Sequence, residues 1–142
     1  MSDDLRSTSS GIGRVLIAVY GILALAALGR SAYQIITKFD EAPAAYALSA
    51  LAAVVYVVAT IALVARGTVW FRVAAIAIAF ELAGVLIVGT LSIIDPALFP
   101  DDTVWSQFGR GYVFIPLVLP VLGLLWLRRV ARARRAAQEV DA

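Results

Sequence analysis

The 142-residue chain contains no cysteine and no histidine, and its twelve basic residues include a single lysine. The lack of cysteine excludes disulfides and thiolate ligands. The lack of histidine removes imidazole ligands for zinc or haem and the commonest general base. No cluster of nucleophile, base or metal ligands is visible in what remains. We therefore expect a protein that is not an enzyme and that needs no cofactor or metal.

Charged residues are also scarce, at 15% of the chain, whereas 62% of it is hydrophobic and the mean hydropathy is +0.91. Soluble domains are only about half apolar, so the bilayer is the expected solvent. A membrane-spanning helix needs about 20 largely apolar residues. Four apolar runs are the candidates for such helices, at about 15–37, 45–65, 71–94 and 112–127.

These runs predict an all-α fold, a transmembrane four-helix bundle that is multi-pass in the cell membrane. The bundle forms one domain, 15–128, between a flexible N-terminal segment, 1–14, and a basic tail, 129–142. The first run follows Arg14 and contains the small-residue patch "ALAALG", a pattern that signal peptides share. Because the run continues into "SAYQII" and three more follow, we expect an uncleaved first helix.

The distribution of Lys and Arg predicts the orientation, since cytoplasmic loops are enriched in these residues. One side of the membrane would carry most of them: Arg6, Arg14, Arg66, Arg72, Arg128, Arg129, Arg132, Arg134 and Arg135. The other side would have Lys38 and Arg110 among the acids Asp40, Glu41, Asp95, Asp101 and Asp102. Both termini are therefore expected in the cytoplasm.

The five arginines after the last run are also weak candidates for lipid headgroup contacts, at about 1 kcal/mol per charge. They are Arg128, Arg129, Arg132, Arg134 and Arg135. The formal net charge of +2 is too small to predict a nucleic-acid partner.

Glu81 stands inside the third apolar run, nine residues after Arg72 and therefore about 13 Å into the membrane at 1.5 Å per residue, close to the middle of the bilayer. A charge there costs about 3 kcal/mol, so the acid must be protonated, paired or in contact with water. Arg30 lies inside the first run, and the same rise per residue places it about 5 Å from the level of Glu81. We predict that these two residues form an intramembrane polar pair.

Three polar residues follow Arg30 at helical spacing, namely Tyr33, Gln34 and Thr37. Such a polar stripe is costly against lipid and should face the bundle interior or an outward-opening cavity. Two interpretations remain open. Arg30 and Glu81 form a buried pair that fixes helix register, or the stripe lines a vestibule and Glu81 binds a proton or cation.

Two further features have less specific interpretations. Ala75, Ala79 and Ala83 form a small-residue strip on the third run, which we interpret as ordinary helix packing. The long connection after the third run, 95–111, has prolines, acids and aromatics and is expected to lie in the membrane interface as a connector. Partner docking and a lid over the stripe are the alternatives. Asp101 or Asp102 would cap a short helix there.

The segments "KFDEAPAAYALSALAAVVY", "LSIIDPALFPDDTVWS" and "GYVFIPLVLPVLGLLWLRR" resemble a group of uncharacterised small actinobacterial four-span integral membrane proteins. The preference for arginine over lysine, with abundant Ala and Val, is similar to that of proteins from GC-rich genomes. The resemblance covers about residues 14–130. It implies a four-helix membrane fold in the cell membrane and assigns no functional residues.

We expect a non-catalytic accessory or assembly subunit of the cell membrane, in contact with lipids and with a larger membrane complex or further copies of itself. A small transporter or an ion or proton channel that uses Glu81 and Arg30 is the alternative.

Overall fold

The computed structural model describes the backbone of residues 2–141 and the side chains of residues 11–140. Four long helices and three short 3₁₀ segments follow one another along the described chain. They are α1 (Ser2–Lys38), η1 (Phe39–Glu41), α2 (Pro43–Val64), α3 (Thr68–Ile94), η2 (Pro96–Leu98), η3 (Ser106–Tyr112) and α4 (Ile115–Asp141).

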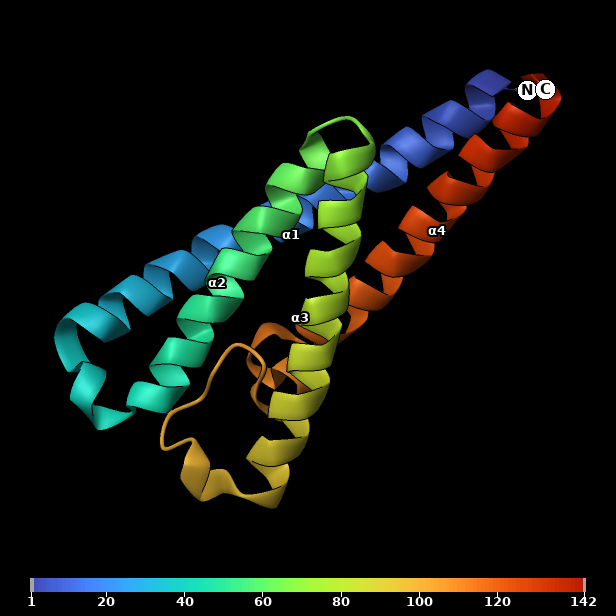
Figure 1. Cartoon of the computed structure of the whole chain (residues 1–142). Coiled ribbons are helices and arrows are strands. Elements are labelled where there is room, and N and C mark those ends of the chain that lie inside the picture. Colours follow the sequence, from blue (N-terminus) through green and yellow to red (C-terminus); the bar gives the residue numbers. More distant parts are fainter. Residues whose placement is uncertain (1, 142) are drawn as a thin grey trace.

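The helices run up and down in sequence order, and each packs against the next (Figure 1). Contacts between α1 and α4 complete the bundle. The start of α1 and the end of α4 lie at the same end of the molecule, which we name the terminal end. The opposite end, where α1 turns into α2 and the 95–114 loop lies, is named the loop end. This arrangement confirms an all-helical bundle.

Local sequence explains several helix boundaries. Pro43 begins α2, where a missing backbone N–H is harmless. Gly67 has φ 114° between α2 and α3, a conformation that glycine adopts without strain.

The first and last helices extend further than the predicted apolar runs. The α1 helix starts at Ser2, within the predicted N-terminal segment, and α4 continues through the basic tail to Asp141. Met1 and the side chains of residues 2–10, Arg6 included, lie outside the described residues.

Three helices are long and apolar enough to cross a membrane: the described part of α1 with η1, then α2, then α3. A fourth span is added if η3 and α4, which meet at a bend of 98°, count as one. The 22 residues of α2 would extend about 33 Å, close to the thickness of the hydrocarbon core. These three or four candidate spans indicate a multi-pass membrane protein.

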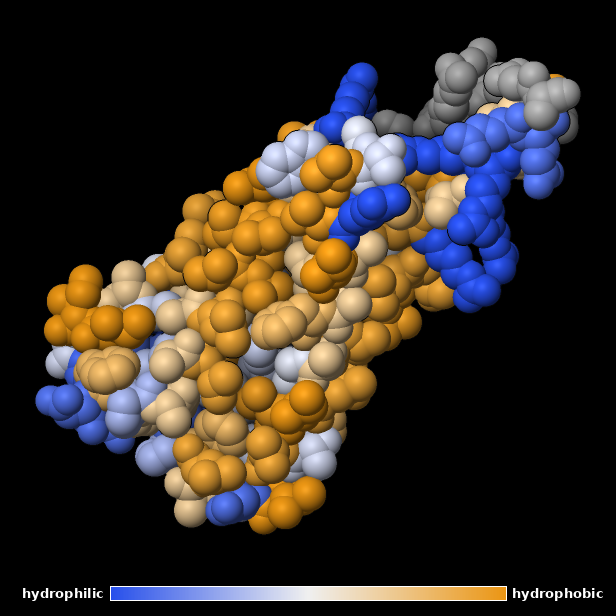
Figure 2. Space-filling model, viewed as in Figure 1, coloured by the Kyte–Doolittle hydropathy of each residue, from blue (hydrophilic) through white to orange (hydrophobic). Residues whose placement is uncertain are grey.

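The surface has the distribution of polarity that a bilayer requires. A broad apolar band covers the middle of the molecule, with polar residues gathered towards both ends (Figure 2). Large aliphatic side chains in the band point outwards, and Leu25 and Ile76 are 74% and 70% exposed. The basic residues of α4 lie at the terminal end, as do Arg66 and Arg72 near the turn between α2 and α3. Because lipid tails are apolar, these side chains can remain on the surface of the band without another protein packed against them.

Small residues line the helix contacts and aromatic rings fill the centre. Buried alanines dominate the inner face of α2, and they let α1 approach closely: Ala45, Ala52, Ala53, Ala59 and Ala62. The largest fully buried side chains include Trp105, Tyr20 and Tyr56. Because Trp105 belongs to the 95–114 loop, that loop enters the bundle and its side chain completes the core.

Gly84 provides the space that Trp105 occupies on α3. A Cβ atom on Gly84 would lie 2.6 Å from Cζ3 of the Trp105 ring. We therefore expect Gly84→Ala to destabilise the protein by about 1–3 kcal/mol through overpacking, despite the better helix propensity of alanine. Thermal unfolding in detergent measures the change.

Gly29→Ala in α1 is the matched control, because nothing lies within 4 Å of a Cβ atom at that position. It should leave the midpoint unchanged or raise it slightly. Equal midpoints for the two variants would contradict the seating of Trp105 on Gly84.

Candidate functional site

Glu81 lies in the centre of the bundle and is completely buried, with 0% of its surface exposed. Its oxygen Oε1 accepts a hydrogen bond from the hydroxyl of Tyr20 on α1, at 3.3 Å. Among the described residues, its second oxygen, Oε2, has no hydrogen-bond partner. The acid thus joins α3 to α1 through tyrosine and keeps one unsatisfied acceptor.

A second tyrosine and the loop tryptophan extend this buried group. The rings of Tyr20 and Tyr56 are tilted at 53°, with centroids 6.3 Å apart. The Tyr56 hydroxyl accepts a hydrogen bond from Nε1 of Trp105, at 3.0 Å. We name Tyr20, Tyr56, Glu81 and Trp105 the core cluster. Its members come from α1, α2, α3 and the 95–114 loop, so it connects most of the fold.

Hydroxyl groups fix the loop that carries Trp105. The Thr103 and Ser106 hydroxyls lie 3.0 Å apart, and each accepts a backbone N–H from the loop, that of Trp105 and that of Thr103 respectively. Ser92 on α3 accepts the backbone N–H of Gln107 at 2.7 Å. These bonds satisfy backbone groups that the buried position of the loop removes from water.

The backbone after Trp105 is unusual, because Gln107, Phe108 and Gly109 all have positive φ angles, at 51°, 61° and 83°. Side-chain-bearing residues adopt this conformation at a cost, and they keep it where surrounding contacts determine it. The expected short helix capped by Asp101 or Asp102 is therefore wrong. The η3 segment has no side-chain cap, and this left-handed stretch interrupts it.

The predicted pair of Arg30 and Glu81 is wrong. Nη2 of Arg30 donates to the backbone carbonyl of Asp102 at 3.3 Å, at the loop end, and no ion pair joins Arg30 to Glu81 in the described structure. The α1 helix starts earlier than the apolar run and lies obliquely to α3 (Figure 1). Tyr20 therefore reaches the level of Glu81, and Arg30 lies ten residues, or about 15 Å, further along α1.

The predicted polar stripe on α1 is also mostly wrong. Tyr33 is 63% exposed, and Thr37 is exposed and donates to the backbone carbonyl of Tyr33 at 2.6 Å. Gln34 is buried as expected, and so is Ser31, which the sequence interpretation missed. Gln34 Oε1 and Ser31 Oγ have no hydrogen-bond partner among the described residues. The α1 helix therefore directs the side chains of Ser31 and Gln34 into the bundle and that of Tyr33 outwards.

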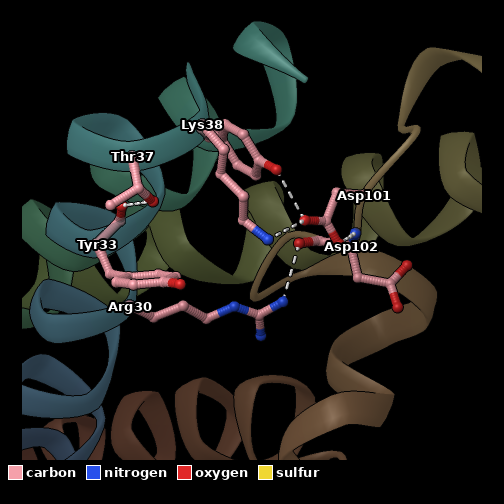
Figure 3. A network of polar contacts seen from close by, with 7 residues as sticks. Arg30, Tyr33, Thr37, Lys38, Asp101 and Asp102 are labelled. Atoms are coloured by element: carbon pink, nitrogen blue, oxygen red, sulfur yellow. Dashed lines mark hydrogen bonds and ion pairs between the residues drawn. The ribbon is translucent and has the colours of Figure 1, made fainter. Parts of the chain in front are cut away.

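A polar network joins α1, α2 and the loop at the loop end (Figure 3). Asp101 accepts a hydrogen bond from the Tyr46 hydroxyl at 2.9 Å and from the backbone N–H of Asp102 at 2.9 Å, and lies 3.8 Å from Nζ of Lys38. Partial burial raises the pKa of Asp101. The two hydrogen bonds and the charges of Lys38 and Arg30 outweigh burial and leave this pKa below its ordinary value.

The five arginines that follow the last apolar run are exposed along α4. One of them, Arg134, has its guanidinium carbon 5.3 Å from the centroid of the Phe71 ring. Their predicted contact with lipid headgroups stays a prediction. Within the part of the chain that the structure describes, no group of three or more acids gathers where it could hold a metal ion.

Comparison of the chain with known protein families, with curated proteins and with solved structures found no match. No family is therefore identified, and the resemblance to actinobacterial four-span proteins stays a prediction. The fold and the candidate spans together describe a small, all-helical, multi-span membrane protein.

The hydrogen bond between Tyr20 and Glu81 predicts that mutations of these two residues have coupled effects on stability. Mutations of Arg30 and Glu81, which are not in contact, should have independent effects. In a double-mutant cycle of Tyr20→Phe and Glu81→Gln, we expect a coupling energy of about 1 kcal/mol, the usual value for one hydrogen bond. Chemical denaturation in micelles provides the free energies. A parallel cycle of Arg30→Gln and Glu81→Gln should be additive, and coupling there with none to Tyr20 would contradict the described geometry.

The lowered pKa of Asp101 predicts a pH effect on stability. An acid whose pKa is lower in the folded state stabilises the fold above its unfolded pKa of about 4, and the contribution disappears as pH falls through the folded value. We therefore expect Asp101→Asn to unfold at a lower temperature than the wild type at pH 6, with the difference shrinking below about pH 4. A difference that is constant from pH 6 to pH 3 would disprove the linkage.

Proposed function

We propose that the protein is a non-catalytic accessory or assembly subunit of the cell membrane that binds another membrane protein through α3. The observation that carries this proposal is the strip of Ala75, Ala79 and Ala83. Ala75 is partly buried and packs against the core of the bundle. Ala79 and Ala83 are exposed, so these two alanines are not used for packing inside the bundle, in contrast to the interpretation from the sequence. Small residues spaced four apart allow a second helix to approach closely within a bilayer, where lipid provides little competing attraction.

The closed core supports this proposal over a conducting role. Trp105 is 2% exposed and fills the loop end of the bundle above Gly84, one helical turn from Glu81. Glu81, Tyr20 and Tyr56 are completely buried. A rigid membrane protein with a filled centre is suited to holding a partner in position.

The charge distribution supports cytoplasmic termini for this subunit. The arginines of α4, together with Arg66 and Arg72, gather at the terminal end, and lysine and arginine are enriched on the cytoplasmic side of membrane proteins. Membrane lipids and a larger membrane protein complex are the proposed partners, and nucleic acid is not.

Isolation of the tagged protein from its native membrane tests the proposal. We expect a larger membrane protein to accompany it in a fixed molar ratio, measured by quantitative mass spectrometry of the purified complex in mild detergent. The double variant Ala79→Leu and Ala83→Leu should lose this protein, because larger side chains prevent close helix approach.

Ala26→Leu is the matched control, since Ala26 is an exposed alanine on α1, away from the strip. It should retain the partner. Purification of the wild type as a lone monomer or as a homo-oligomer would contradict the accessory role, and so would equal loss of the partner in the control.

The second candidate is a small transporter or an ion or proton channel that uses Glu81. The specific observation in its favour is the buried Oε2 atom, which has no hydrogen-bond partner within the described part of the chain and could accept a proton or a cation. Arg30 no longer belongs to this hypothesis, because it lies at the loop end. Ion or proton flux in proteoliposomes that Glu81→Gln abolishes, with folding retained, would favour transport over the accessory role.

A further inference from the structure

A polar pocket of about 450 Å³ opens at the loop end, between α1 and the 95–114 loop. Its lining combines two arginines with loop residues: Arg30, Asp102, Thr103, Ser106, Gln107, Arg110 and Gly111. The volume is within the range of small-molecule sites, about 300–1,000 Å³. The pocket is separate from the buried core cluster and from the exposed strip on α3.

The two arginines bring positive charge to this pocket with little compensation. Arg30 donates to the backbone carbonyl of Asp102, and Arg110 donates to Oε1 of Gln107, both at 3.3 Å. Both acceptors are neutral and both bonds are long. In the described chain neither guanidinium takes part in an ion pair. Each guanidinium has five N–H donors, so most of this donor capacity is left for a ligand.

Asp102 is the one acid in the pocket lining, and its carboxylate lowers the positive charge there without forming an ion pair with Arg30. The bond between these residues uses the main-chain carbonyl of Asp102, while its side chain is exposed and points away from the guanidinium (Figure 3). The neighbouring Asp101 is held by Tyr46 and Lys38 and also interacts electrostatically with Arg30, but the positive charge of Lys38 balances the negative charge of Asp101. The pocket thus keeps a net positive charge.

The wall of the pocket is already fixed in shape. Thr103 and Ser106 bond to each other and to the loop backbone, and the adjoining Trp105 is anchored in the core. The backbone N–H of Gln107 is held by Ser92. A fixed wall reduces the ordering cost of binding.

We propose that this pocket binds a phosphate group, carried by a phospholipid headgroup or by a small soluble phosphate. Guanidinium groups match phosphate oxygens in a fork geometry, and a phosphate has enough oxygens to accept hydrogen bonds from Arg30 and Arg110 together. A carboxylate has only two oxygens and matches one fork. The position suits both sources, since polar residues gather towards the loop end (Figure 2), and polar surface of a membrane protein is expected where it meets lipid headgroups and water.

Calorimetric titration of the full-length protein in a non-ionic detergent tests the proposal, with inorganic phosphate and dihexanoyl phosphatidylglycerol as separate probes. We expect saturable binding of at least one probe, and about tenfold weaker binding in both Arg30→Gln and Arg110→Gln, the loss typical of one hydrogen bond to a charged group. Arg66→Gln, which changes an exposed arginine at the terminal end, is the matched control and should bind like the wild type.

Asp102→Asn keeps the test decisive if an arginine variant fails to fold. Removing a negative charge from the pocket wall should strengthen binding about threefold, a gain that misfolding does not produce. Binding of the lipid alone would assign the phosphate to a headgroup, and binding of inorganic phosphate alone would assign it to a soluble compound. Absence of saturable binding for both probes, an equal loss in Arg66→Gln, or no gain in Asp102→Asn would overturn the proposal.

Discussion

The structure depends on the insertion of one loop side chain, Trp105, into the centre of the helical bundle. Its ring lies against Gly84 on α3, and its indole N–H bonds to the hydroxyl of Tyr56 on α2. A tryptophan buries a large apolar area and requires a partner for its N–H, and this position supplies both. The loop end is thereby closed, and the connection between α3 and α4 becomes part of the core.

This insertion also explains how the bundle holds a buried acid. Glu81 lies one helical turn from Gly84, within a layer of aromatic rings, and the Tyr20 hydroxyl donates to one of its oxygens. This hydrogen bond offsets part of the cost of removing a carboxyl group from water. The rest of the cost remains, because Oε2 has no hydrogen-bond partner among the residues that the structure describes. That residual cost makes Glu81 the natural focus of the transport hypothesis. The filled space around it favours a structural role.

The apolar runs were sufficient to predict an all-helical membrane bundle, because run length alone indicates candidate spans. They also placed Glu81 near the middle of a span, where burial was one of two open interpretations. Its partner was mispredicted because the comparison of depths assumed parallel helices, whereas α1 lies obliquely to α3. Tyr20 and Tyr56, each in the middle of an apolar run, were an unused signal. The position of Trp105 depends on contacts between residues that are far apart in the sequence, and helical periodicity carries no information about such contacts.

Fluorescence of Trp105 tests the closed core most directly. In the double variant Trp70→Phe and Trp126→Phe, Trp105 is the only tryptophan of the chain. The described burial predicts emission at short wavelength and little quenching by acrylamide in detergent micelles or in liposomes. Long-wavelength emission with quenching like that of free tryptophan in a folded protein would mean that the loop lies outside the bundle, and it would contradict the account.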